Sequence, residues 1–237
     1  QVETVMIVYV NGDSHTAAAE AVTPHAFAED DPKYFYLGRA PHPDNLLCSW
    51  GKLLSNSLRA GFHCGAESAS SNTRIMRTTR EWLQTRSAHD TFVIIQWSTW
   101  ERQEWKIGDI YYQITASGTD DVPEMYAQRY KEFVANVDWK SETRRAHEDI
   151  WDFHQELKKN KIKHIFFNGN RDFSLIQKQR NWGVNYIGPY DPTQTYDAIL
   201  KSKGFQTVSP KSWHFGEDGH SYFNRFMLQY IITNKLI

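Results

Sequence analysis

An apolar run that ends abruptly in a tight turn is the feature that most constrains the fold of this chain. Residues 4–10 read TVMIVYV, and residues 11–15 read NGDSH. The β-branched and apolar side chains predict a buried strand, and Gly12 permits a backbone conformation that other residues resist. The alanine-rich residues 16–22 predict the start of a helix. Such an arrangement holds the Ser14 hydroxyl at the carboxyl edge of a sheet; the alternative is an ordinary βα turn in which Ser14 caps the helix.

Further strands and helices alternate along the chain. Residues 91–97, TFVIIQW, are apolar at successive positions, which indicates a central strand covered on both faces. Other strands are predicted at residues 61–65 and 161–168, with short ones at 34–37, 184–187 and 205–208. Amphipathic helices are predicted at residues 44–59, 73–86, 123–137 and 222–236, and from a break at 138–141 to residue 159. This alternation predicts an α/β fold in which helices cover both faces of a parallel sheet.

The length of 237 residues fits one large domain of this kind. No internal repeat, low-complexity tract or linker interrupts it, so residues 1–237 are interpreted as a single domain. Residues 98–122 follow the central strand and predict an irregular insertion.

Charge and composition argue against several classes of partner. A net charge of −1 gives no field that would recruit nucleic acid or an anionic membrane, and no run approaches the length of a transmembrane span. Cys48 and Cys64 form neither a disulfide framework nor a metal-ligand spacing, and they fit a reducing compartment. No signal peptide is visible, which slightly favours the cytoplasm, although a processed precursor would look the same. We therefore predict no nucleic-acid or membrane partner, no metal and no organic cofactor, and leave the oligomeric state open.

Residues at the carboxyl ends of the strands are the candidates for chemistry, because ligands of open α/β sheets bind there. Residues 13–15 follow the first strand, and residues 213–220, WHFGEDGH, precede the last helix. A serine nucleophile needs a neutral imidazole within hydrogen-bond reach and a group that orients the imidazole. His214 lies in a loop and can face this edge. His220, at the helix start, is expected to be an internal cap or a packing partner.

Two of these segments carry a family resemblance. Gly12-Asp13-Ser14 resembles the first block of the SGNH (GDSL-like) hydrolases. His214-Phe-Gly-Glu-Asp-Gly-His220 resembles their last block, in which a catalytic histidine is followed six residues later by the histidine of a Gly-His pair. The blocks stand near opposite ends of the chain and in the family's order. The resemblance implies a flavodoxin-like, three-layer α/β/α fold and serine-dependent ester hydrolysis or acyl transfer, with Ser14 as nucleophile and His214 as general base.

The chain departs from the family at the group that orients the histidine. The family has an aspartate three residues before the catalytic histidine, and Lys211 stands there in this chain. A lysine cannot orient an imidazolium as a carboxylate does. The alternatives are a backbone carbonyl or another carboxylate, for which the candidates are Asp218, Glu217 and Asp172.

The oxyanion positions also depart from the family. Its second block supplies a glycine N–H, but residues 69–72 read ASSN and contain no glycine. The Ser70 N–H and the Asn72 side-chain amide are the candidate donors. The third block normally supplies an asparagine, and Ser98 stands at its position with a shorter donor. Losing one oxyanion donor costs roughly 3 kcal/mol of transition-state stabilisation.

Tryptophans suggest a substrate class. Trp97, Trp100 and Trp105 follow the central strand, and Trp213 adjoins His214. Exposed indoles at a cleft suit stacking against sugar rings, so an acylated carbohydrate is our hypothesis for the ester substrate. The structural alternative is that these rings pack as local core beneath the insertion.

Two functions therefore stay open. The first is an esterase or deacetylase that forms an acyl-enzyme on Ser14 and acts on a small-molecule or glycan ester. The second is a non-catalytic or vestigial carbohydrate-binding module on the same fold, which the Lys211, Ser98 and missing-glycine departures favour. A flavin or nucleotide binder is a distant third, because the chain has no glycine-rich phosphate loop.

Overall fold

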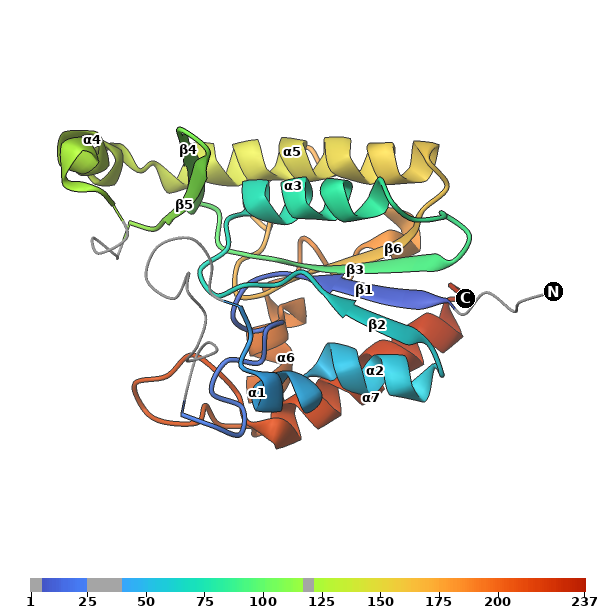
Figure 1. Ribbon diagram of the computed structural model, residues 1–237. Helices are drawn as coiled ribbons and strands as arrows, with labels where there is room; N and C mark the ends of the chain where they lie inside the picture. The colour runs from blue at the N-terminus through green and yellow to red at the C-terminus, as the bar shows by residue number, and fades with distance from the viewer. Residues whose placement is uncertain (1–5, 25–39, 117–121) are drawn as a thin grey trace.

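A four-stranded parallel sheet lies at the centre of the fold (Figure 1). The computed structural model describes residues 6–24, 40–116 and 122–237. The sheet has the order β2-β1-β3-β6, and the strands are β1 (Ile7–Asn11), β2 (Gly61–Cys64), β3 (Thr91–Trp97) and β6 (Lys163–Asn168). The register pairs Val10 with Cys64, Asn11 with Ile95 and Trp97 with Asn168, so the carboxyl ends of the strands meet along one edge.

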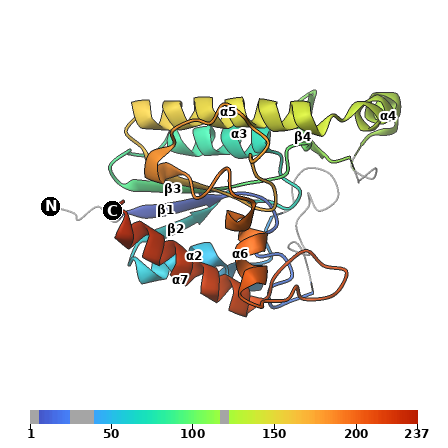
Figure 2. The ribbon, with the colours of Figure 1, turned by 180° about the vertical axis from the view of Figure 1, so that it is seen from behind.

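Helices cover both faces of this sheet (Figures 1 and 2). One face carries α3 (Asn72–Leu83) and α5 (Trp139–Lys159), and the other carries α1 (Pro43–Leu47), α2 (Trp50–Ser57), α6 (Tyr196–Ser202) and α7 (Glu217–Thr233). Successive residues of β3 point to opposite faces: Phe92 and Ile94 pack in one core cluster, whereas Val93 and Ile95 pack in the other. The expected three-layer α/β/α architecture is therefore confirmed.

Two predicted helices differ from the observed ones. The predicted helix at 44–59 is split into α1 and α2, because the Ser49 hydroxyl accepts the Lys52 N–H and starts a new helix. The break predicted at 138–141 is shorter and lies at residues 137 and 138: α4 (Ala127–Asn136) ends before it, and Asp138 caps α5 by accepting two backbone N–H groups.

The segment after β1 forms turns rather than the predicted helix. Ala18 and Glu20 adopt φ values of 56° and 61°, which a continuing right-handed helix does not allow. Gly12 also differs from expectation, since it does not have a positive φ. Glycine is needed there for close approach: a Cβ would lie 2.6 Å from the Thr16 Oγ1.

The predicted irregular insertion contains an antiparallel hairpin, β4 (Gln103–Ile107) and β5 (Ile110–Ile114). Gly108 begins its two-residue turn with a φ of 61°. The predicted strands at 184–187 and 205–208 are reduced to single bridges, and the one at 34–37 lies outside the described residues. The remaining elements are the short 3-10 helices η1 (Glu124–Tyr126), η2 (Gly183–Asn185) and η3 (Pro192–Gln194). None of the helices formed by the described residues combines the length and the apolarity that crossing a membrane requires.

Candidate active site

Two loops distant in sequence meet at the carboxyl edge of the sheet (Figures 1 and 2). One follows β1 and carries Ser14 and Glu20, and the other precedes α7 and carries Ser212 and His214. The His214 Nδ1 lies 2.5 Å from the Glu20 Oε2, and the Ser212 hydroxyl donates to the same oxygen at 2.7 Å. The His214 N–H in turn donates to the Ser212 Oγ at 3.0 Å, which fixes the loop around the imidazole.

The Glu20 carboxylate determines which nitrogen of His214 is available for chemistry. A carboxylate only accepts hydrogen bonds, so the neutral imidazole carries its proton on Nδ1 and leaves the Nε2 lone pair unused. This is the arrangement that a general base needs. Sequence reasoning missed Glu20, because the left-handed turn that brings its carboxylate to His214 lies in a segment with the composition of a helix.

None of the three carboxylates that the sequence suggested for this role contacts His214 among the described residues. Asp218 accepts the Gly219 N–H, Asp172 accepts the Ser174 N–H, and Glu217 lies in the first turn of α7. That expectation is corrected, since the carboxylate in contact with His214 belongs to Glu20.

The electrostatics keep His214 neutral and Glu20 ionised. Burial lowers the pKa of His214, as does positive charge on His15, and the hydrogen bond to Glu20 only partly offsets them. Burial acts to raise the pKa of Glu20, but hydrogen bonds from His214 and Ser212 outweigh it and lower that pKa. A histidine whose pKa lies below 6.5 is uncharged at neutral pH, as a base must be.

Ser14 lies at the same edge and is 7% exposed. Its neighbour His15 packs edge-on against the His214 ring, with 5.5 Å between the ring centroids. Within the described residues no hydrogen bond joins the Ser14 hydroxyl to His214, and the Ser14 N–H has no acceptor. In unliganded enzymes, catalytic hydrogen bonds are often long and tighten when substrate binds.

The buried carboxylate of Asp13 fixes the turn that carries Ser14. Its Oδ1 accepts from the His15 Nδ1 at 3.0 Å and from the Gln96 Nε2 at 2.9 Å. Its Oδ2 accepts from the Ser98 hydroxyl at 2.8 Å and the Arg102 Nη1 at 3.0 Å. Burial acts to raise the pKa of Asp13, but His15, Arg102 and Gln96 together hold it well below its usual range. Asp13 therefore stays ionised and ties together β1, β3 and the start of the insertion.

Arg102 is a second residue that sequence reasoning missed. The residues around Arg102 have the composition of a solvated, ion-paired loop. The Arg102 guanidinium nevertheless reaches the buried carboxylate of Asp13, 89 residues away. Only tertiary structure brings Arg102 and Asp13 together, so no local signal could have found the pair.

The three expected oxyanion donors are engaged within the protein. The Ser98 hydroxyl gives its proton to Asp13, and the Ser70 N–H donates to the Glu67 carbonyl at 3.2 Å. Asn72 accepts the Ser98 N–H at 2.8 Å and donates to the Ser98 carbonyl at 3.2 Å, which joins the start of α3 to the end of β3. Of the donors considered, the Ser14 N–H is the one without a partner in the described chain.

Three of the four tryptophans proposed for substrate binding are core residues, as the structural alternative held. Trp97 packs against Phe153 and Phe166, and Trp100 stacks on Phe173. Trp105 is buried in a cluster with Ile114 and Tyr130. Trp213 is 72% exposed and adjoins His214. The other histidine of that segment is an internal cap, as expected: the His220 Nδ1 accepts the N–H of Trp50, which begins α2.

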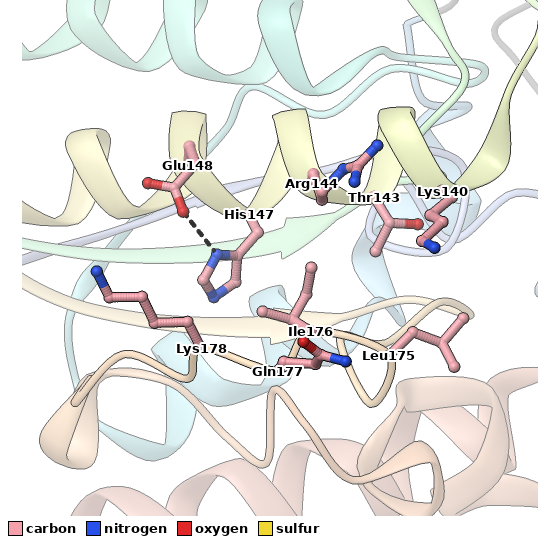
Figure 3. A pocket seen from close by; sticks show the side chains of 9 residues that line it. All are labelled: Lys140, Thr143, Arg144, His147, Glu148, Leu175, Ile176, Gln177 and Lys178. Atoms are coloured by element: carbon pink, nitrogen blue, oxygen red, sulfur yellow. Dashed lines mark hydrogen bonds and ion pairs between the residues drawn. The ribbon is translucent and has the colours of Figure 1, made fainter.

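A separate cavity lies between α5 and residues 175–178 (Figure 3). Its volume is about 400 Å³, and its lining includes Lys140, Arg144, His147 and Lys178. None of the predicted site residues lines it. In the part of the chain that the structure describes, no three His, Cys, Asp or Glu side chains gather as they would around a metal ion.

Comparisons with known proteins give distant likenesses. No family model matches the chain, and no curated protein matches it in sequence. Among solved structures, it is similar to the psychrotrophic esterase EstA from Pseudoalteromonas sp., in a form inhibited by monoethylphosphonate. The identity is 9% over 96% of this chain and 97% of that one, with a TM-score of 0.48. It is also similar to a protein assigned to the lipolytic G-D-S-L family from Desulfitobacterium hafniense, with 12% identity over 95% and 99% of the two chains and a TM-score of 0.44. Likenesses this distant transfer no activity, so the function of this chain is inferred from its own residues.

Proposed function

We propose that this chain is a serine-dependent ester hydrolase that forms an acyl-enzyme on Ser14. The observation that carries the proposal is the Glu20–His214 pair, which holds a neutral imidazole at the edge where Ser14 lies. The resemblance of the Ser14 and His214 segments to the first and last SGNH blocks supports the same assignment. Glu20 takes the orienting role of the family aspartate that Lys211 replaces in this sequence.

The mechanism follows from these positions. The His214 Nε2 takes the proton of the Ser14 hydroxyl as the oxygen attacks the ester carbonyl. The Ser14 N–H stabilises the oxyanion, since it has no competing acceptor in the described chain. The leaving alkoxide takes up a proton as its bond to the carbonyl carbon breaks, water gives up a proton as it attacks the acyl-enzyme, and Ser14 regains its proton from His214.

The substrate class rests on fewer residues than the mechanism. Because Trp97, Trp100 and Trp105 are buried, Trp213 alone of these rings can stack on a sugar. We therefore propose simple acetate esters as substrates. Acylated carbohydrates are substrates only if Trp213 provides a surface on which the sugar stacks.

Labelling of the serine tests this proposal. Wild type, Ser14→Ala and His214→Ala are incubated with a small fluorophosphonate, and the intact masses are measured. We expect one adduct on the wild type and none on either variant. An adduct that persists in Ser14→Ala would show that a different nucleophile reacts.

A non-catalytic binding module is the second candidate. The observation that favours it is the engagement of the Ser98 hydroxyl and the Ser70 N–H inside the protein, which leaves few donors for an oxyanion. Folded wild type that forms no adduct supports this candidate, and glycan binding that survives Ser14→Ala would identify it.

A further inference from the structure

A second carboxylate–histidine pair lies beside the first. The His15 Nδ1 is 3.0 Å from the Asp13 Oδ1, just as the His214 Nδ1 is held by Glu20. Asp13 is ionised, so Nδ1 of His15 carries a proton and Nε2 is left for another partner. Within the described chain, that Nε2 makes no hydrogen bond.

The two imidazoles are close enough to serve one ester group. Their ring centroids lie 5.5 Å apart, and the ring planes meet at 67°. His15 directly follows Ser14 in the chain, and its side chain is held by the same buried carboxylate that fixes the Ser14 turn. His15 therefore lies in the turn that carries Ser14 and packs against His214.

His15 is surrounded by groups from several elements. Asp13 contacts it directly, and Arg102 contacts the other oxygen of Asp13. Tyr196 from α6 and His214 pack edge-on against its ring. Glu20 binds His214, and positive charge on His15 contributes to lowering the pKa of His220, which lies in α7.

Of these neighbours, Asp13 and Glu20 are the carboxylates, and Asp13 is the more deeply buried. Burial lowers the pKa of His220 to about 3 and raises that of Tyr196, so both are neutral at pH 7. Burial lowers the pKa of His214, and positive charge on His15 lowers it further. His214 is therefore the base, and His15, held on the buried carboxylate of Asp13, is the group left to act as the acid.

We propose that His15, oriented by Asp13, is the general acid that protonates the leaving alcohol, while His214 is the base for Ser14. This role deepens the proposed function and rests on it. The reacting residues are then Ser14, the Glu20–His214 pair as the base and the Asp13–His15 pair as the acid.

The proton balance closes over one turnover. In acylation, the Ser14 Oγ forms a bond to the carbonyl carbon and gives its proton to the His214 Nε2. The bond to the alkoxide breaks, and the His15 Nε2–H gives its proton to the leaving oxygen. In deacylation, neutral His15 takes a proton from the attacking water, and His214 returns its proton to Ser14. Both histidines recover their starting states, and ester and water have become acid and alcohol.

Esters that differ in their leaving group test this role. We expect His15→Asn to change kcat/KM for 4-nitrophenyl acetate by less than tenfold, because nitrophenolate leaves without protonation. For benzyl acetate, whose leaving group needs a proton, we expect kcat/KM to fall by roughly 10²- to 10⁴-fold. Deacylation also uses His15, so the variant should release one equivalent of nitrophenolate in a burst and then turn over slowly.

The pH dependence gives a readout that a structural role would not move. For wild type and benzyl acetate, kcat/KM should rise with pH as His214 loses its proton and fall again at the pH where the acid step fails. In His15→Asn the falling limb should disappear while the rising limb remains. Equal losses of kcat/KM for the two esters, or an unchanged falling limb, would overturn the role of His15.

Fluorophosphonate labelling separates this proposal from the previous one. Fluoride is a weak base and leaves unaided, so His15→Asn should still be labelled at Ser14, which also shows that the variant is folded. His15→Gln serves as a second variant if His15→Asn does not fold. Labelling of both proteins without a leaving-group difference overturns only the role of His15, whereas wild type that is never labelled overturns the esterase itself and this role with it.

Discussion

At Glu20, a left-handed backbone conformation turns a carboxylate toward a histidine 194 residues away. Single residues of this kind decide the chemistry at this edge. Ser14 and His214 stand out in the sequence, because each lies in a short block with a recognisable order. Glu20 and Arg102 do not, because their partners come from other loops. Trp97 shows a related limit: a tryptophan at the end of a strand fits a buried position and an exposed one equally well in sequence.

Ser98 could position Asp13 or stabilise the oxyanion, and a substitution distinguishes these two roles. Its hydroxyl proton points at Asp13, so it does not face the substrate. We expect Ser98→Ala to change the rate of Ser14 phosphonylation by less than about tenfold, whereas loss of an oxyanion donor costs about 10²- to 10³-fold. Stopped incubations with the fluorophosphonate measure this rate, and a loss of the larger size would return Ser98 to the oxyanion site.

Trp97 and Trp213 make a matched pair for stability. Trp97 is fully buried between the sheet and α5, so Trp97→Ala should lower the free energy of unfolding by about 3–5 kcal/mol. Trp213 is mostly exposed, and Trp213→Ala should change that free energy by less than about 0.5 kcal/mol. Urea unfolding of the two variants checks both values, and similar losses for the two would contradict the placement of Trp97.

At the scale of elements, prediction succeeded where hydrophobic periodicity was strong. The uninterrupted apolar run of β3 and the helical spacing along α5 and α7 mark those elements in the sequence, although α7 begins at Glu217 rather than at residue 222. The hairpin β4–β5 was missed because its strands, QEWKI and IYYQI, lack a clean alternation of apolar and polar residues. Capping set the boundary between α1 and α2, since the Ser49 hydroxyl starts a new helix within the single predicted one.

Gly108 tests the hairpin directly. Its φ of 61° lies in the left-handed region, and a Cβ there would meet nothing within 4 Å. The cost of replacing it is therefore a backbone cost alone, and Gly108→Ala should lower the free energy of unfolding by about 1 kcal/mol. An unchanged free energy of unfolding in urea would argue against a positive φ at this turn.

At the scale of the whole molecule, the parallel sheet brings the ends of distant segments to one edge. The order β2-β1-β3-β6 places the loops after β1 and β3 side by side, and the loop before α7 contacts the loop after β1. Figure 2 shows this edge from behind. The sequence predicts this architecture because alternating strands and helices allow few arrangements. It does not predict which side chains meet across the edge, since those contacts depend on loop conformations.

Buried histidines make the stability of the fold depend on pH. His154 and His164 share a hydrogen bond of 2.8 Å, and burial lowers the pKa of each from 6.5 to about 4. Between pH 6.5 and pH 4 the unfolded chain binds more protons than the native one, so the free energy of unfolding falls as the pH falls through this window.

Urea unfolding at several pH values measures this dependence. We expect the slope between pH 6.5 and pH 4 to be shallower in His154→Phe than in wild type. His89→Gln, which changes an exposed histidine, serves as the control and should keep the wild-type slope. A slope that is the same in all three proteins would show that the buried pair does not titrate on unfolding.

The most direct test of the account is the rate of Ser14 phosphonylation in Glu20→Gln. An amide can donate to the His214 Nδ1 and so stabilise the wrong tautomer, which removes the base from Nε2. We expect a loss of roughly 10³- to 10⁴-fold, the size seen when an orienting carboxylate is replaced by its amide. Asp218→Asn, which changes a carboxylate near His214 in sequence but not in contact with it, should label at the wild-type rate. Wild-type labelling of Glu20→Gln, or an equal loss in Asp218→Asn, would contradict the assignment of Glu20 as the group that orients the catalytic histidine.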